Sequence, residues 1–274
     1  MKNAMLSIAK KEYMDNIRSK WIIIISIIFA SLTILVSYAG SLGSTWQDLT
    51  FTIIGMMVLV QYLIPIIGLM LGYAAIVGEI ERGSMNSLLS FPVTRLEIIA
   101  GKFLGLGAVL SSTIAIGFGI AAIVISINVQ DVEYIGYLIF IGASILIGLV
   151  FLSASLLISS FFRTRSTAMA MAVFSWFFFT IIWSIIMSSI LVTTVGLEAL
   201  MEPTFTVPDW YYGISLINPL SAYSGLVSLN INSEAAGAGL LPSFYTSPLM
   251  IVILIIWIIV PLILTYFLFN KKDI

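Results

Sequence analysis

Six apolar runs, each long enough to cross a lipid bilayer, constrain this chain more than any other feature of its sequence. A helix needs about 17 to 25 mostly apolar residues to cross. Two of the runs look too long for a perpendicular crossing, so we expect those helices to tilt or to extend into water. The chain is therefore predicted to be an all-α integral membrane protein, a single transmembrane domain of six helices. The runs are 21–39, 51–77, 98–127, 134–162, 168–192 and 249–269.

The composition is typical of a membrane protein and excludes many catalytic mechanisms. Hydrophobic residues make up 60% of the chain and charged residues 9%, against about 25% charged in a soluble domain. Cysteine and histidine are absent, which excludes disulfides, a thiol nucleophile, a histidine base, and thiolate or imidazole metal sites. The formal net charge of -1 provides no basic field for nucleic acid. We predict that the chain is not an enzyme and assign it no catalytic residue, no metal site and no nucleic-acid partner.

The basic residues predict the orientation of the chain. They occur before the first run, in the segment 78–102, between the fourth and fifth runs, and after the sixth, whereas the opposite side has none. Because basic residues stay on the cytoplasmic side of a membrane, we expect both termini in the cytoplasm and a multi-pass protein of the plasma membrane. The alternation of connecting segments with and without basic residues also supports six spans, because one span more or fewer would put basic residues on both sides of the membrane. The twelve are Lys2, Lys10, Lys11, Arg18, Lys20, Arg82, Arg95, Lys102, Arg163, Arg165, Lys271 and Lys272.

Residues 1–20 are predicted to form an amphipathic elbow helix. Leu6, Ala9, Tyr13 and Ile17 recur at steps of three or four, so they share one face of a helix. That face suits the acyl boundary of a bilayer. A basic leader that orients the first span is the simpler interpretation, and the two are compatible. The first run is longer than the roughly 7 to 15 residues of a signal-peptide core, so we expect a span rather than a cleaved leader.

The segment 78–102, GEIERGSMNSLLSFPVTRLEIIAGK, is the longest polar interruption on the basic side. Ser84 is predicted to cap a short helix, SMNSLLSF, which Pro92 ends. Thr94 and Glu97 have the spacing of a capping box at the start of a second helix. The position of the segment between two apolar runs suggests a docking element, and an ordinary loop between two spans is the alternative.

The segment 193–247 is the largest predicted extracytoplasmic piece. Its aromatic cluster 210–212 is expected to lie at the membrane surface. Residues 214–229, which contain Pro219, are expected to form broken helices lying on that surface. Two roles stay open for the segment, a partly ordered cap and a re-entrant or gating element.

Inside the spans the sequence contains few functional groups. Their middle thirds hold no Asp, Glu, Lys or Arg, which argues against a proton- or ion-coupled carrier. Gln61 and Pro65 are candidates for a kink or a transmembrane pathway, because the amide needs a partner and the proline frees a carbonyl. Glycines in 98–127 and 134–162 predict close helix packing. No GxxxxGK[ST] loop occurs, so another chain would have to hydrolyse the fuel for any uphill transport.

The segment GEIERGSMNSLLSFPVTRLEIIAGKF resembles the cytosolic coupling segment of ABC-2 type permeases, the membrane subunits of ATP-binding-cassette exporters. Its acidic pair, Leu-Leu, Pro, Arg and Gly-Lys carry the resemblance. IAKKEYMDNIRSKW is similar to that family's elbow helix, and the resemblance covers essentially the whole chain. Within the family, YAAIVGEIERGS, SLINPLSAYSGLVSLN and the end at Lys271 and Lys272 most resemble the permease of the transporter that matures the copper site of nitrous oxide reductase.

The resemblance implies an assembly of two permease chains, expected to be a homodimer, with two ABC ATPase subunits. ATP and Mg²⁺ would be bound by the ATPase, and no cofactor by this chain. The elbow helix and the segment 78–102 would sit in the ATPase clefts, with charged residues making polar contacts and Leu88, Leu89 and Phe91 filling an apolar groove. The residues implied in ATPase coupling are Glu79, Glu81, Arg82, Gly83, Ser84, Leu88, Leu89, Phe91, Pro92 and Arg95.

Several functional interpretations are compared. An ABC permease would either conduct cargo between two copies or transmit force through 193–247 to an extracytoplasmic partner protein. A conduit needs a partly polar cavity at the dimer axis, whereas a force transmitter has closely packed spans and a partner bound outside. A membrane scaffold or assembly subunit without an ATPase is the alternative, and an intramembrane enzyme lacks catalytic groups. Membrane lipid is a partner in every case.

Overall fold

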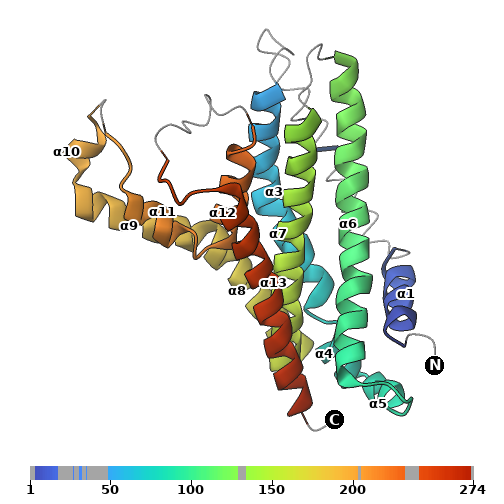
Figure 1. The fold of residues 1–274 in the computed structure, drawn as a ribbon. Coiled ribbons are helices and arrows are strands. Elements are labelled where there is room, and N and C mark those ends of the chain that lie inside the picture. Colours follow the sequence, from blue (N-terminus) through green and yellow to red (C-terminus); the bar gives the residue numbers. More distant parts are fainter. Residues whose placement is uncertain are drawn as a thin grey trace.

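A computed structural model describes residues 4–17, 27, 31–32, 35, 49–128, 134–202, 205–231 and 241–272. In this part of the chain every regular element is a helix, which confirms the all-α expectation (Figure 1). Most of the first predicted span, 21–39, lies outside the described residues.

Five helical segments coincide with the other predicted spans, and each is long and apolar enough to cross a membrane. α6 has 34 residues, which at 1.5 Å per residue makes it about 51 Å long. Because the hydrocarbon core of a bilayer is about 30 Å thick, α6 must tilt or extend beyond it. The segments are α3 (Leu49–Gly72) with α4 (Val77–Glu81), α6 (Arg95–Asn128), α7 (Tyr134–Phe161), the continuous helix α8 (Arg165–Phe177), η1 (Phe178–Ile182) and α9 (Trp183–Val195), and α13 (Ser247–Asn270).

One end of the bundle collects the basic residues, and we name it the basic end. It is the end where α4, α5 (Ser84–Leu89), the start of α6 and the last turn of α13 lie (Figure 1). All nine Lys and Arg residues in the described part of the chain belong to elements at this end. They are Lys10, Lys11, Arg82, Arg95, Lys102, Arg163, Arg165, Lys271 and Lys272.

Close packing of α3 against α7 forms the centre of the bundle. A Cβ atom on Gly68 would lie 2.8 Å from the carbonyl oxygen of Gly148, a distance that real Cβ atoms do not adopt. Ser155 on α7 donates a hydrogen bond to the Gly68 carbonyl at 3.3 Å. These contacts confirm the role predicted for small residues. A Cβ atom added to Gly119 or Gly142 would meet no neighbour within 4 Å among the described residues, so packing does not explain these two glycines.

Helix α1 (Ala4–Ile17) packs along the first half of α6. A Cβ on Gly101 would lie 2.8 Å from Cβ of Ile8, and one on Gly105 would lie 2.7 Å from Cβ of Glu12. The buried face of α1 therefore differs from the predicted stripe, of which Leu6 and Ile17 are exposed. The physical reason is that small residues on α6 admit the backbone of α1, and α1 turns its charged Glu12 inward. The placement of α1 in the membrane interface stays a prediction.

The helix from α8 to α9 leans away from the bundle and contains a π-helical turn, η1 (Figure 1). Asn218, which is buried, donates from Nδ2 to the carbonyl oxygen of Phe179 at 2.7 Å. Its Oδ1 accepts from the amide of Leu220 at 2.9 Å and caps the next helix. A π turn disrupts the regular hydrogen-bond ladder, and here the Asn218 amide satisfies one of its carbonyls.

The segment after α9 forms α10 (Leu197–Leu200), α11 (Asp209–Ser215) and α12 (Pro219–Ser228). The predicted break at Pro219 is confirmed, because α11 ends and α12 begins with proline in its first turn. α12 packs into the bundle, and its position relative to the membrane surface stays a prediction. Its side chains are buried against α7 and α13, and Tyr245 packs on the ring of Tyr212 with centroids 5.3 Å apart. The gating and cap roles of this segment stay predictions.

Replacing Gly105 by Leu should displace α1 from α6, because the new side chain would meet Ala9 and Glu12. Loosening of α1 should raise tryptic cleavage after Lys10 and Lys11, measured by limited digestion in detergent with mass spectrometry of the peptides. A Cβ atom added at Gly119 on the same helix meets no atom of the described residues within 4 Å, so Gly119→Leu is the matched control. Equal cleavage rates in the two variants would contradict the packing described for α1.

Candidate functional site

The segment 78–102 forms the short helices α4 and α5 before the long helix α6 begins. Gly83 stands between α4 and α5 with φ 71°, in the left-handed region that favours glycine. Gly83 is the N-cap of α5, so the predicted capping role of Ser84 is wrong. The Ser84 hydroxyl instead donates back to the carbonyl oxygen of Glu79 at 3.3 Å, because the glycine turn makes Ser84 the first helical residue.

The second half of the segment follows the sequence prediction closely. α5 ends at Leu89, shortly before Pro92, two residues earlier than the predicted SMNSLLSF helix. The amide of Thr94 donates to Oε2 of Glu97 at 2.8 Å, and the amide of Glu97 donates to Oγ1 of Thr94 at 3.2 Å. This reciprocal pair is the predicted capping box, and it is confirmed.

The predicted coupling residues divide into an outward-facing and an inward-facing group. Phe91 is 64% exposed, and Glu81, Arg82, Gly83, Ser84 and Pro92 are also exposed. Leu88 and Leu89 instead pack against a buried cluster that joins α1, α5, α6 and α13. Of the three apolar side chains expected to meet an ATPase, Phe91 is therefore the most available. The cluster consists of Ile8, Ile76, Met85, Ile98, Ile99 and Phe269.

The ammonium of Lys102 is the centre of the charged contacts. It lies 2.6 Å from Oε1 of Glu12 on α1 and 2.8 Å from Oε1 of Glu79 on α4. The Lys102 side chain is only 1% exposed, so its charge is neutralised by these two carboxylates rather than by water. One ion cluster thus joins α1, α4 and α6.

A second ion pair joins α4 to α8. The Glu81 carboxylate accepts from the backbone amide of Arg165 at 2.8 Å and lies 3.1 Å from its Nε atom. Arg165 also donates from Nη2 to the carbonyl oxygen of Gly78 at 2.7 Å. Glu79 and Glu81, the two acidic residues implied in coupling, are therefore both bound to neighbouring helices.

Two further cations bind the free carbonyls at helix C-termini. Arg95 donates from Nη1 to the carbonyl oxygens of Phe269 and Lys272, the latter at 3.2 Å, so it faces the end of α13. Lys272 donates to the carbonyls of Ser160 and Phe162 at the end of α7, at 2.9 and 2.7 Å. Positive charge at a helix C-terminus is favourable because the last carbonyls carry partial negative charge. Burial, and then the charge of Arg163, lower the pKa of Lys272.

A polar cavity of about 450 Å³ opens between α1, α3, α4, α6 and α8. Five charged side chains line it, and the Oε2 atom of Glu79 has no hydrogen-bond partner among the described residues. The cavity lies at the root of the coupling segment, so its charged walls belong to the same cluster. The five charged side chains that line the cavity are Glu12, Glu79, Arg82, Lys102 and Arg165.

Deeper in the bundle, Gln61 and Pro65 lie where the sequence required protein contacts. Gln61 donates from Nε2 to the Ser224 hydroxyl on α12 at 2.8 Å, and Pro65 is buried inside α3. Beside Gln61 on the same helix, the carbonyl oxygen of Tyr62 accepts from the indole of Trp176 at 2.9 Å. These contacts connect α3 to α8 and α12, and a transmembrane pathway through Gln61 stays a prediction.

The comparison with protein families decides the class of this chain. Residues 6–274 match the protein family described as "ABC-2 family transporter protein". The chain belongs to this family. It is similar to a protein of Stutzerimonas stutzeri named "Probable ABC transporter permease protein NosY", with 32% identity over 98% of this chain and 99% of that protein. The protein of the same name from Pseudomonas aeruginosa PAO1 is 35% identical over 86% of this chain and 85% of its own length.

Family membership gives the coarse function directly. The chain is a permease, the membrane subunit of an ABC transporter, and an ABC ATPase is the partner that such a subunit requires. Its helices make it a multi-pass membrane protein. The permease subunit is not itself the catalytic subunit in this family.

Sequence reasoning missed the partners of the charged residues in this permease. No structural contact was predicted for Glu12 or Arg165. Asn218 lies within the motif SLINPLSAYSGLVSLN, but no capping role was predicted for it. A signal existed for Lys102, because a lysine at the edge of an apolar run requires a compensating charge. For Asn218, an Asn directly before Pro is typical of an N-cap followed by the first helical position.

Replacing Lys102 by Met should destabilise the permease by about 3 to 5 kcal/mol, because removing one partner of a buried ion pair leaves uncompensated charge. The apparent melting temperature in detergent, followed by size-exclusion chromatography after heating, should fall clearly. The triple variant with Glu12→Gln and Glu79→Gln should recover part of the loss. Lys10→Met, at an exposed lysine of α1, is the control. A melting temperature for Lys102→Met equal to that control would rule out the ion cluster as a stabilising contact.

Proposed function

We propose that this permease couples ATP hydrolysis by a separate ABC ATPase to movement of its membrane helices, and so to export of cargo or to force on an outside partner. One observation carries the proposal. Segment 78–102 presents Arg82 and Phe91 outward, while Glu79 and Glu81 at its root are bound to Lys102 and Arg165. The exposed residues are suited to contact a docked ATPase, and the ion-paired residues are suited to transmit its movement to the membrane helices.

The contacts define a route for mechanical displacement. When the docked segment is pushed, the Glu79 contact would carry the movement to α6, and through Glu12 to α1. The Glu81 contact would carry it to the start of α8. Since α6 and the helix from α8 to α9 are long and continuous, a shift at their ends would reach the opposite side of the membrane. Arg95 would add the end of α13 to the moving unit.

The charge distribution supports the proposed orientation. Every Lys and Arg of the described residues belongs to an element at the basic end, and basic residues remain on the cytoplasmic side of membranes. We therefore place the basic end and both termini in the cytoplasm of a plasma-membrane protein. The ATPase, with its ATP and Mg²⁺, would bind there, and α1 would lie as an elbow helix in the interface.

The proposed assembly contains two permease chains and two ATPase chains. The helix from α8 to α9 supports a second permease copy, because only 6% of its most apolar window is buried. Its exposed apolar side chains, for example Phe174 and Ile185, need lipid or protein to cover them. We propose a homodimer, with α10 and α11, which have no buried residues, available to an extracytoplasmic partner.

The proposed biological process follows from the resemblance within the family. Both relatives carry the name NosY, and the resemblance noted from YAAIVGEIERGS and SLINPLSAYSGLVSLN points to the transporter that matures the copper site of nitrous oxide reductase. We propose the same process for this chain. Conduction between two copies and force transmission to the outside are the two modes, and a dimer structure with its outside partner distinguishes them.

Replacing Arg82 and Phe91 by Ala should uncouple the permease from its ATPase, since these exposed side chains would contact the docked subunit. The tagged full chain is coexpressed with candidate ABC ATPase chains and purified in mild detergent. We expect the wild type to retain an ATPase, and the double variant to lose about tenfold or more of the bound ATPase, as interface anchors commonly do. Permease-stimulated ATPase activity should fall in parallel.

Phe244→Ala is the matched control, because Phe244 is also exposed but lies just before α13 at the opposite end. It should leave ATPase retention unchanged. Unchanged retention and activity in the Arg82 and Phe91 double variant would reject the docking surface. Recovery of an intact wild-type permease with no ATPase would instead favour the scaffold function.

A further inference from the structure

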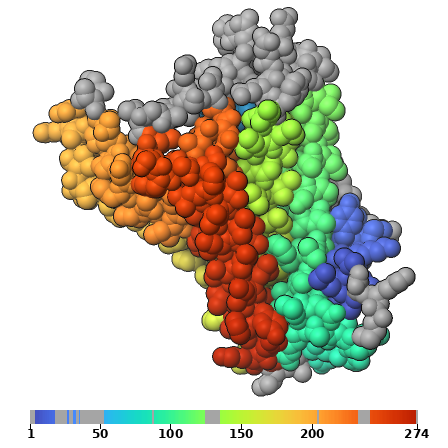
Figure 2. Space-filling model, viewed as in Figure 1, coloured from blue at the N-terminus to red at the C-terminus, as the bar shows by residue number. Residues whose placement is uncertain are grey.

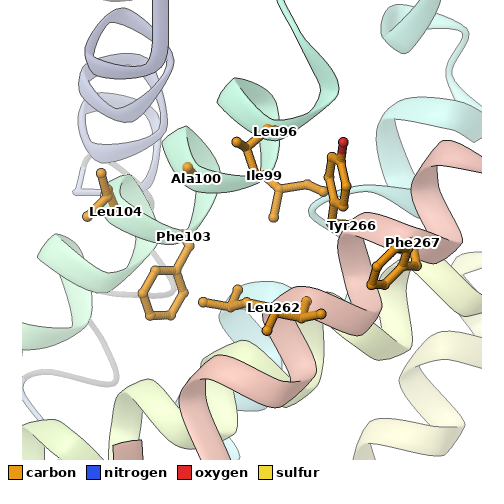
Figure 3. A pocket seen from close by; sticks show the side chains of 9 residues that line it. Leu96, Ile99, Ala100, Phe103, Leu104, Leu262, Tyr266 and Phe267 are labelled. Atoms are coloured by element: carbon orange, nitrogen blue, oxygen red, sulfur yellow. The ribbon is translucent and has the colours of Figure 1, made fainter. Parts of the chain in front are cut away.

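An apolar groove of about 370 Å³ lies between α6 and α13 on the outside of the bundle. Figure 2 shows the two helices side by side in the lower half of the molecule. In Figure 3, Phe103 and Leu262 face each other at one end, and Tyr266 approaches Ile99 and Leu96 at the other. The walls are formed by Leu96, Ile99, Ala100, Phe103, Leu104, Leu262, Ile263, Tyr266 and Phe267.

On each wall of the groove, a basic residue lies one helical turn beyond the lining residues, toward the basic end. On α6, Arg95 precedes Ile99 by four residues, so the two lie on the same helix face one turn apart. On α13, Lys271 follows Phe267 by four residues, and its amide bonds to the Phe267 carbonyl at 3.3 Å. The groove is therefore apolar along its length and has positive charge at one mouth.

Within the described residues, this positive charge has no carboxylate partner. Among the described residues, neither Arg95, Arg163, Lys271 nor Lys272 forms an ion pair with an acidic side chain. Lys271 is exposed, and Arg163 is close enough to contribute to the lowered pKa of Lys272. A concentration of like charge at the edge of a membrane attracts a mobile anion.

We propose that this groove binds an acidic glycerophospholipid from the leaflet at the basic end. An acyl chain would lie along the apolar walls, and the phosphate would rest between Arg95 and Lys271. The match is specific to an amphiphile, because one site combines an apolar channel with an anion-attracting mouth at the basic end. Basic pockets between helices on the cytoplasmic side are known sites for anionic headgroups.

The bound lipid would reinforce the junction of α6 and α13. Arg95 already joins these helices through the carbonyls of Phe269 and Lys272, and its contact with the Phe269 ring places its guanidinium carbon 5.3 Å from the ring centroid. A phosphate between Arg95 and Lys271 would add a second connection at the same place. The inference goes beyond the proposed coupling function and needs no ATPase.

Native mass spectrometry of the full chain, titrated with phosphatidylglycerol or phosphatidylcholine of the same acyl chains, tests the proposal. We expect retention of phosphatidylglycerol to be roughly tenfold stronger, since each basic residue near an anionic lipid contributes about a fewfold effect. Lys271→Glu should remove this preference. Ile263→Trp, which fills the groove from an exposed wall position, should reduce retention of both lipids.

Matched controls separate the site from general membrane attraction. Lys11→Glu reverses an exposed charge on α1, and Ile259→Trp enlarges an exposed residue one turn from Ile263 on the same helix. Both should behave as the wild type. Equal retention of the two lipids by the wild type, or retention that neither test variant changes, would overturn the proposal. Lys271 is exposed, so its variant remains informative if Ile263→Trp fails to fold.

A protein occupant would also overturn the proposal. Because the chain contains no cysteine, Phe267→Cys places a single thiol in the groove wall. Oxidation in membranes that yields a disulfide-linked dimer would assign the groove to a second copy. A crosslink from this thiol to a second cysteine introduced within 21–39 would assign it to that segment of the chain.

Discussion

The buried ammonium of Lys102 is the interaction on which the charged half of the structure depends. A lysine with 1% exposure is stable only when opposite charges surround it, because its desolvation costs several kcal/mol. Glu12 and Glu79 provide these charges from two other helices. Because Glu12, Glu79 and Lys102 must meet, the positions of α1, α4 and α6 relative to one another are fixed. The glycines of α6 make the close approach of α1 sterically possible.

The basic end and the middle of the bundle are stabilised by different physical interactions. At the basic end, ion pairs and cation contacts to carbonyls connect α1, α4, α6, α7, α8 and α13. Farther along, neutral hydrogen bonds from Gln61, Trp176 and Asn218 connect α3, α8 and α12. In lipid every backbone polar group needs an internal partner. The polar side chains therefore cluster beside Pro65 and the π turn, where the regular helix ladder is interrupted.

Much of the fold followed from local sequence properties. Five predicted spans coincide with helices, the Thr94 and Glu97 capping box forms, and the break at Pro219 is present. The predicted cap at Ser84 failed because the neighbouring Gly83 takes the cap position in a left-handed turn. The face of α1 that meets α6 was not predicted, because amphipathic periodicity does not identify which face meets another helix. The membrane-facing role of the α1 stripe stays a prediction. The coupling roles of Glu79 to Arg95 remain the proposal made above, now with their contacts assigned.

Hydropathy, charge asymmetry and caps determined, from the sequence alone, that this chain is a helical membrane protein with its basic residues on one side. These are properties of runs of neighbouring residues, so a linear sequence contains them. Tertiary structure alone decided that Glu12 meets Lys102, 90 residues away, and that Arg95 faces α13 rather than solvent. The physical reason is that pairing depends on shape and on the position of small residues in two helices at once, which no single stretch of sequence specifies.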